Sequence, residues 1–170
     1  MQRLILGILL AGLVHAAEQP SAVPFFKQQK NGCGAASVAM VMHYWRGQQA
    51  GARVYPNALE VYRSLYDPEL YGIPLVEMKH YLEDNGFRAY TLHGRWADVE
   101  QHVGRGRPVI VALKKKDSSP MHFAVVTGTT EDRVLLNDPT QKSTRRMKRA
   151  DFEKQWSQAD GWMLLAVPQE

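Results

Sequence analysis

The chain has 170 residues, of which 45% are hydrophobic and 22% are charged, and its formal net charge is +4. This length suits one domain with a real core, and the composition excludes collagen, a coiled coil and extended disorder. Basic residues gather in two clusters, at 114–116 and 142–149. We interpret them as solvated surface or, alternatively, as patches for acidic peptides or anionic lipid headgroups. Nucleic-acid binding is not expected, because no aromatic residue interleaves with either cluster.

The first 16 residues have the layout of a secretory signal peptide. Arg3 gives a positive start, residues 4–14 form an apolar run, and small residues follow at Ala16. The run is short for a permanent membrane span, which needs about 20 apolar residues. We therefore expect cleavage near Ala16, a mature domain over residues 17–170 without an integral membrane segment, and a periplasmic or secreted location. Retention as an uncleaved anchor is the alternative.

Helical patterns fill the first half of the mature chain. The apolar run that follows the cysteine is hydrophobic almost all round, which is typical of a buried helix. The third helix ends at Asn85-Gly86, a common C-terminal signal. In chain order we predict an extended stretch, a turn and three helices, at 17–27, 32–34, 35–45, 57–66 and 75–85.

Strand patterns dominate the second half. We predict strands at 87–92, 109–113, 122–127, 133–136 and 162–167, and short helices at 96–103 and 150–156. A hairpin turn is expected around Glu131 and Asp132, between the third and fourth strands. Helices followed by a mainly antiparallel sheet predict an α+β fold, with the N-terminal helices packed on the sheet. Four tyrosines are interpreted as core residues rather than cleft lining: Tyr55, Tyr62, Tyr66 and Tyr71.

The single cysteine carries the main functional signal. One cysteine forms no intramolecular disulfide, so Cys33 is either a buried apolar residue or a reactive thiol. It lies between Gly32 and Gly34, just before the predicted buried helix, where free backbone N–H groups and the helix dipole favour a thiolate. The glycines also leave room for a substrate carbonyl. We therefore predict that Cys33 is a nucleophile.

His122 is the best candidate base among the six histidines. It opens an apolar strand, whereas His43 lies too far along the helix that follows Cys33. The others have polar surroundings or leave with the signal peptide. Asp138 ends the next predicted strand, so antiparallel pairing of the two strands brings its carboxylate next to His122. We predict that Asp138 orients the imidazole.

Gln28 is the candidate oxyanion donor. It precedes Cys33 on the predicted extended stretch, where its side-chain amide and the Cys33 N–H are placed to hold a tetrahedral intermediate. Gln29 is a rival for the same role. One cysteine and scattered histidines offer no zinc-ligand spacing, so neither a metal nor another cofactor is expected.

Four segments follow one another in a distinctive order over nearly all of the mature chain. They read VPFFKQ at 23–28, GCGAA at 32–36, HFAVV at 122–126 and LNDP at 136–139. Together they resemble the bacteriocin-processing, double-glycine-leader family of papain-like cysteine peptidases. The resemblance implies a papain-like α+β fold, a Cys33–His122–Asp138 triad with Gln28 in the oxyanion hole, and peptide or protein substrates. Relatives often cut after a Gly-Gly pair.

Two departures from that family limit what is carried over. Ala35 stands where many relatives have proline, which changes little chemically. The best-known relatives are fused to a membrane transporter with an ATPase, and this sequence has no phosphate-binding glycine-rich loop, so ATP use and leader export are not expected. The resemblance leaves room for a separate export system as a partner.

The sequence thus predicts a stand-alone, exported cysteine peptidase that forms a thioester on Cys33. Two alternatives remain open. One is an amidase or transpeptidase that uses the same triad on cell-wall or other peptides. The other is a non-catalytic peptide-binding module on the same scaffold.

Overall fold

The computed structural model of the protein describes residues 23–48, 54–116 and 120–169. The predicted signal peptide, with its cleavage near Ala16, lies outside the described residues, as does the first part of the extended stretch predicted at 17–27. The described residues form five helices and six strands. In chain order these are α1 (Cys33–Gln48), α2 (Ala58–Leu65), α3 (Leu75–Asp84), β1 (Phe87–His93), α4 (Trp96–Gly104), β2 (Val109–Leu113), β3 (His122–Thr129), β4 (Arg133–Asn137), β5 (Arg145–Lys148), α5 (Arg149–Ser157) and β6 (Trp162–Pro168).

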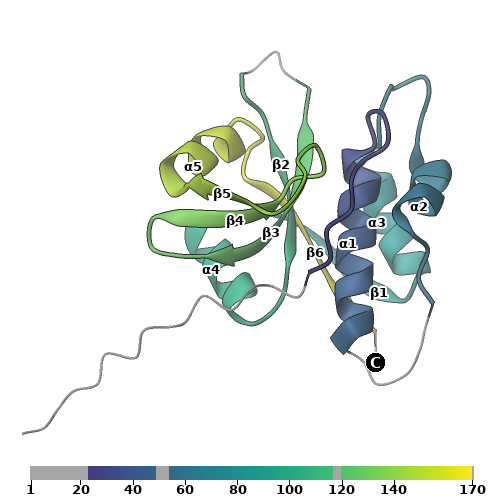
Figure 1. Ribbon diagram of the computed structural model, residues 1–170, viewed down its shortest axis with the longest axis horizontal. Coiled ribbons are helices and arrows are strands. Elements are labelled where there is room, and N and C mark those ends of the chain that lie inside the picture. Colours follow the sequence, from purple (N-terminus) through teal and green to yellow (C-terminus); the bar gives the residue numbers. More distant parts are fainter. Residues whose placement is uncertain (1–22, 49–53, 117–119, 170) are drawn as a thin grey trace, which may run out of the picture.

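All six strands pair antiparallel in one sheet, in the order β1-β6-β2-β3-β4-β5. Helices α1, α2 and α3 lie together beside the sheet, and α4 and α5 lie on its other side (Figure 1). The predicted α+β fold, with its N-terminal helices packed on a mainly antiparallel sheet, is confirmed. Each predicted helix and strand is present, with ends shifted by a few residues.

The central strand β2 explains why its sequence is apolar without interruption. Ile110 and Ala112 belong to the core beneath α1–α3, whereas Val109 and Val111 belong to the second core beneath α4 and α5. Successive side chains of a strand point to opposite faces of the sheet. A strand covered by helices on both faces therefore has no position for a polar side chain.

Helix α1 is surrounded by other elements. It packs against α2 and α3 on one side and against β3 on the other, and residues 34–42 are buried. This burial accounts for its hydrophobic character all round. None of the helices in the described residues is both long and apolar enough to span a membrane.

The edge strand β5 was not predicted. It pairs with β4, with Met147 opposite Val134, and it lies within the basic cluster at 142–149. Met147 is the only apolar residue of this four-residue strand, so the sequence contains no hydrophobic alternation to indicate it. Part of a cluster interpreted as solvated surface is therefore built into the edge of the sheet.

The interpretation of the four tyrosines as core residues holds only in part. Tyr55 is buried, and Tyr62 and Tyr66 are partly buried, with ring centroids 4.8 Å apart, and pack on the core beneath α1–α3. Tyr71 is 74% exposed and has a φ of 51° in the loop before α3. The expectation was wrong for Tyr71 because this loop carries the side chain out of the helical packing.

Candidate active site

Cys33 is the first residue of α1, as the sequence predicted. Its side chain is partly exposed, and the backbone N–H of Phe123 in β3 donates a hydrogen bond to its sulfur over 3.5 Å. The helix begins with a hydrogen bond from the N–H of Ala36 to the carbonyl oxygen of Gly32. The sulfur therefore lies at the positive end of a 16-residue helix, and a donor from the sheet faces it.

The two glycines around Cys33 allow close packing at the start of α1. A Cβ at Gly34 would lie 2.9 Å from the sulfur of Met78 and 3.0 Å from Cβ of Ile73. A Cβ at Gly32 would lie 2.6 Å from Cδ2 of Tyr62. Both positions face the helical neighbours of α1. The glycines therefore let α1 approach α2 and the segment that leads into α3, and room for a substrate carbonyl stays a prediction.

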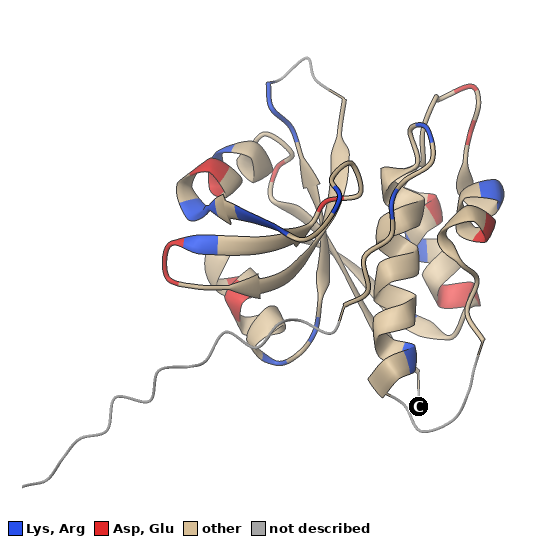
Figure 2. Ribbon diagram, in the orientation of Figure 1, with Lys and Arg blue, Asp and Glu red and all other residues tan. Residues whose placement is uncertain are grey.

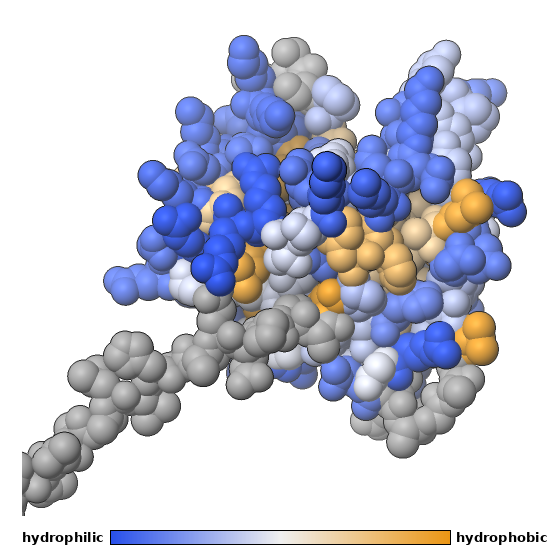
Figure 3. Space-filling model, in the orientation of Figure 1, coloured by the Kyte–Doolittle hydropathy of each residue, from blue (hydrophilic) through white to orange (hydrophobic). Residues whose placement is uncertain are grey.

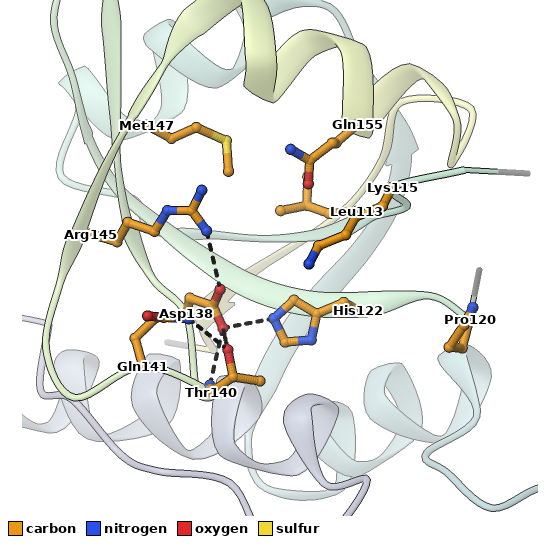
Figure 4. A pocket seen from close by; sticks show the side chains of 10 residues that line it. All are labelled: Leu113, Lys115, Pro120, His122, Asp138, Thr140, Gln141, Arg145, Met147 and Gln155. Carbon is orange, nitrogen blue, oxygen red and sulfur yellow. Dashed lines mark hydrogen bonds and ion pairs between the residues drawn. The ribbon is translucent and has the colours of Figure 1, made fainter.

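His122 and Asp138 form a close pair at one end of the β3–β4 hairpin. Nε2 of His122, the first residue of β3, lies 2.7 Å from Oδ1 of Asp138, which directly follows β4 (Figure 4). Antiparallel pairing of the two strands brings these ends together, which confirms the predicted proximity of the two residues. The Asp138 side chain is 9% exposed and that of His122 is 29% exposed.

Other groups hold the Asp138 carboxylate in place. The backbone N–H and the hydroxyl of Thr140 both donate to Oδ1, over 3.0 Å and 2.7 Å. The guanidinium of Arg145 lies 3.9 Å from Oδ2. Contacts with Thr140 and Arg145 thus fix the orientation of the carboxylate. Because the carboxylate is fixed, it limits the positions that the ring of His122 can adopt.

The environment shifts the pKa values of this pair in opposite directions. Burial by itself would lower the pKa of His122, but hydrogen bonds and charge from Asp138 and Cys33 outweigh it and raise the pKa to about 9. Burial would raise the pKa of Asp138, but hydrogen bonds from His122 and Thr140 and the imidazolium charge lower it to about 2. An imidazolium beside a carboxylate is thus the stable form at neutral pH.

Gln28 reaches the same site from the extended segment before α1. Its backbone N–H donates to the carbonyl oxygen of Pro139 over 3.2 Å, so the segment is attached to the turn that carries Asp138. Its side-chain oxygen is buried and has no hydrogen-bond partner among the described residues. Gln29 is exposed and does not line the site. Between the two glutamines that the sequence offered, the geometry favours Gln28.

A cleft of about 440 Å³ connects these groups. It lies between the α1–α3 side of the molecule and the start of β3. Its lining includes Gln28, Cys33, Tyr71, Ile73, His122 and Phe123. The four predicted site residues therefore converge: three line this cleft, and Asp138 lies directly behind His122.

Two positioning residues were missed by the sequence analysis. The buried side-chain amide of Asn137 donates to the carbonyl oxygens of Val23 and Pro24, over 3.1 Å and 3.3 Å, and so holds the segment that carries Gln28. Thr140 orients Asp138, as described above. Thr140 was detectable, because an aspartate often accepts from the backbone two residues further on in a turn. The role of Asn137 joins residues more than 110 positions apart, and no local pattern indicates it.

Comparisons with known proteins show the family and the fold of this chain. The model of the Peptidase_C39 like family matches residues 20–162. None of the curated proteins matches the chain.

Several solved structures share the fold. A double glycine motif protease from an AMS/PCAT transporter, in complex with the leader peptide, is 20% identical with a TM-score of 0.68, over 88% of this chain and 94% of that one. The peptidase domain of Streptococcus ComA, a bifunctional ABC transporter, is 20% identical with a TM-score of 0.65, over 86% and 99%. The peptidase domain of Streptococcus mutans ComA is 15% identical with a TM-score of 0.54, over 85% and 98%. The family match over most of its length shows that this chain belongs to the Peptidase_C39 like family of peptidases.

Proposed function

We propose that the protein is a cysteine peptidase that cleaves peptide bonds through a thioester on Cys33. One observation carries the proposal: a partly exposed sulfur at the start of α1 shares a cleft with His122, and a buried carboxylate 2.7 Å away holds that imidazole. This order of nucleophile, base and orienting group is the one that activates a catalytic cysteine.

The acylation step follows from the placement of these groups. The Cys33 thiolate attacks the carbonyl carbon of the scissile bond, a C–S bond forms, and the carbonyl π electrons move to the oxygen. The backbone N–H of Cys33 and the side-chain amide of Gln28 donate hydrogen bonds to this oxyanion. When the intermediate collapses, the C–N bond breaks and the leaving nitrogen takes a proton from the His122 imidazolium.

Deacylation uses the imidazole that acylation leaves neutral. His122 takes a proton from water as the water oxygen attacks the thioester carbonyl. The C–S bond breaks, the acyl group leaves as a carboxylic acid, and the thiolate–imidazolium pair is restored. Asp138 keeps the ring in position in both steps and stabilises its charged form.

A peptide is the substrate class that the comparisons support. One similar structure, the double glycine motif protease, contains a bound leader peptide. We propose peptide or protein substrates for this chain, and export of the mature domain after cleavage near Ala16, on the basis of the signal-like pattern at residues 1–16. N-terminal sequencing of protein recovered from the producing cells tests the cleavage.

Covalent labelling tests the peptidase directly. The full chain is incubated with an electrophilic peptide probe, the labelled residue is located by mass spectrometry, and a peptide library is then screened for cleavage. We expect the label on Cys33. We also expect Cys33→Ser and His122→Ala each to lower kcat/KM by at least about 10³-fold, because the three groups act as one unit, with an unchanged circular dichroism spectrum.

A matched control and a pH measurement make the test specific. His80→Ala, an exposed histidine on α3, should leave turnover unchanged. Cys33 should still be alkylated rapidly by iodoacetamide at pH 6, where an ordinary thiol is almost entirely protonated, and His122→Ala should remove this reactivity. A label on another residue, or full turnover by Cys33→Ser, contradicts the proposal. Product masses separate hydrolysis from transfer of the acyl group to an amine.

A further inference from the structure

A second cavity lies behind the His122–Asp138 pair. It has a volume of about 350 Å³ and shares Pro120 and His122 with the cleft that contains Cys33. Its other lining residues come from the end of β2, the turn after β4, β5 and α5 (Figure 4). His122 and Asp138 belong to the proposed triad, and Thr140 and Arg145 orient Asp138. The remaining lining residues, Lys115 among them, have no role in the chemistry proposed above.

The cavity is positively charged. Lys115 and Arg145 both line it, and their side chains point toward the space above the His122–Asp138 pair (Figure 4). Asp138 is the only acidic residue among its described lining residues, and its carboxylate already accepts hydrogen bonds from His122 and Thr140 and lies 3.9 Å from the Arg145 guanidinium. Lys115 is exposed and forms no ion pair with any of the described residues. At neutral pH the imidazolium of His122 adds a third positive charge. One negative charge thus faces three positive charges, those of Lys115, Arg145 and the His122 imidazolium.

The two basic clusters of the sequence meet at this cavity. Lys115 belongs to the cluster at 114–116 and Arg145 to the cluster at 142–149. The strands that lead to them, β2 and β5, are not neighbours in the sheet, but α5 packs against both. The N–H of Lys114 donates to the carbonyl oxygen of Gln155 in α5, which fixes the end of β2 there. Figure 2 shows the basic residues along β5 and at the end of β2. The fold thus brings together two charges that are 30 positions apart.

The chemistry of the leaving group decides which part of a substrate reaches this cavity. The leaving nitrogen takes its proton from His122, so it must face the imidazole. The substrate residues that follow the cleaved bond are therefore expected to extend from the sulfur toward His122. The second cavity begins at His122 and extends away from the cleft that contains Cys33. The second cavity is therefore adjacent to the expected path of the leaving peptide.

We propose that this cavity is a subsite for the leaving side of the substrate and that it binds a carboxylate. The carboxylate belongs either to an Asp or Glu side chain shortly after the cleaved bond or to the C-terminus of a short leaving peptide. Lys115 and Arg145 would donate charge-assisted hydrogen bonds to it, and Leu113 and Met147 would contact the attached methylene groups. This inference rests on the proposed peptidase function. It adds a preference for substrates with a carboxylate after the cleaved bond, which the triad alone does not create.

Matched peptides test the subsite. Starting from a peptide that the full chain cleaves, Glu and Gln are exchanged at the first, second and third positions after the cut, one at a time. A separate pair, with two residues after the cut, ends in a free carboxylate or an amide. We expect kcat/KM to be about threefold to fivefold higher for the acidic member at one position, or for the free terminus, as ion pairs with exposed cations allow. The position that responds identifies the source of the carboxylate.

Charge variants show whether the cavity is responsible. In the double variant Lys115→Gln with Arg145→Gln, the Glu/Gln ratio should fall to about one. The matched double variant Lys116→Gln with Lys148→Gln should keep the wild-type ratio, because it removes the same charge from exposed residues that do not line the cavity. Comparing the two peptides within each variant cancels any general loss of activity.

Charge reversal gives a result that a change in folding would not produce. Lys115→Glu should invert the preference, so that a peptide with Lys at the responsive position is cleaved faster than the Glu peptide. Equal rates for acidic and neutral peptides at all positions in the wild-type protein overturn the subsite. If the electrophilic probe still labels Cys33 in that case, the peptidase function stands without it. If the probe does not label Cys33, the peptidase function and the subsite fall together.

Discussion

The two sides of the cleft contribute to the site by different physical means. The helical side, formed by α1–α3 and their loops, supplies the sulfur of Cys33 and surrounds it with apolar packing. The strand side, formed by the sheet with α4 and α5, supplies His122, Asp138 and the cations of the second cavity. On the face in Figure 3, hydrophobic residues gather around α1, and hydrophilic residues cover most of the strand side.

This difference predicts how each side responds to substitution. The position of the sulfur depends on how closely α1 packs against its neighbours, so changes there should alter the free energy of unfolding and the reactivity of Cys33 together. The protonation state of the imidazole depends on hydrogen bonds and charge, so changes on the strand side should alter pH profiles. A helical-side substitution that alters only the pH profile, or a strand-side substitution that lowers stability equally at every pH, would contradict this division.

Asp138→Asn should lower kcat/KM more than Gln28→Ala or Gly34→Ala. The amide cannot stabilise the imidazolium and can hold the ring in the wrong tautomer, so we expect kcat/KM to fall by at least about 10²-fold. In the wild-type protein, kcat/KM should decline as the pH rises past about 9, where His122 loses its proton. Removal of the carboxylate lowers the pKa of His122, so the alkaline decline of the variant should begin at lower pH.

Stability measurements check the same pair independently of activity. The raised pKa of His122 stabilises the fold fully below its unfolded value of 6.5, and this stabilisation is lost as the pH rises through about 9. The lowered pKa of Asp138 stabilises the fold above pH 3.8, and this stabilisation is lost as the pH falls through about 2. Urea unfolding should therefore show the greatest difference between wild type and Asp138→Asn, about 2 kcal/mol, between pH 4 and 6.5. A difference that does not vary with pH would contradict the assigned pair.

Gln28→Ala should have the next largest effect. Loss of one oxyanion donor typically lowers kcat by about 10²-fold, and we expect a loss of that size with little change in KM. Gln29→Ala is the matched control, because this neighbouring side chain is exposed and does not line the cleft. Equal losses in the two variants would show that the segment tolerates neither change and that the Gln28 amide has no special role.

The sequence allowed the convergence of His122 and Asp138 to be predicted, for a physical reason. The two residues stand at the start and just past the end of consecutive strands, and a short turn makes antiparallel pairing the simplest arrangement. Cys33 was predictable in the same way, because the glycines and the apolar run that follows mark the start of a buried helix. Local patterns were therefore sufficient to place each group on its own element.

Local patterns do not show how elements far apart in the chain approach one another. The hydrogen bond from Phe123 to the Cys33 sulfur joins residues 90 positions apart, and it depends on the packing of α1 against β3. The meeting of Lys115 with Arg145 depends on β5, a strand without hydrophobic alternation. The packing role of Gly34 was also not predicted, because it depends on Met78 and Ile73, which lie about 40 positions further along the chain.

Gly34→Ala addresses the helical side and should act mainly on stability, with a smaller effect on catalysis than the preceding variants. The added methyl group would meet Met78 and Ile73 at 2.9–3.0 Å in a buried position, and overpacking of this kind costs about 1–3 kcal/mol. Urea unfolding should therefore show a loss of stability that is similar at pH 5 and pH 8, because no titrating group is involved. The rate at which an electrophile labels Cys33 should fall as well, since the start of α1 must shift to accommodate the methyl group.

A second glycine of the same helix provides the matched control. A Cβ at Gly47 would have no heavy atom within 4 Å, so Gly47→Ala meets no obstacle and should stabilise the protein by up to about 1 kcal/mol. The labelling rate at Cys33 should not change. Opposite signs for one substitution at two ends of α1 would show that close packing, and not glycine flexibility, sets the position of the sulfur. If Gly34→Ala is as harmless as Gly47→Ala, the sulfur is held from the strand side instead, through Phe123, and the division between the two sides of the cleft is wrong.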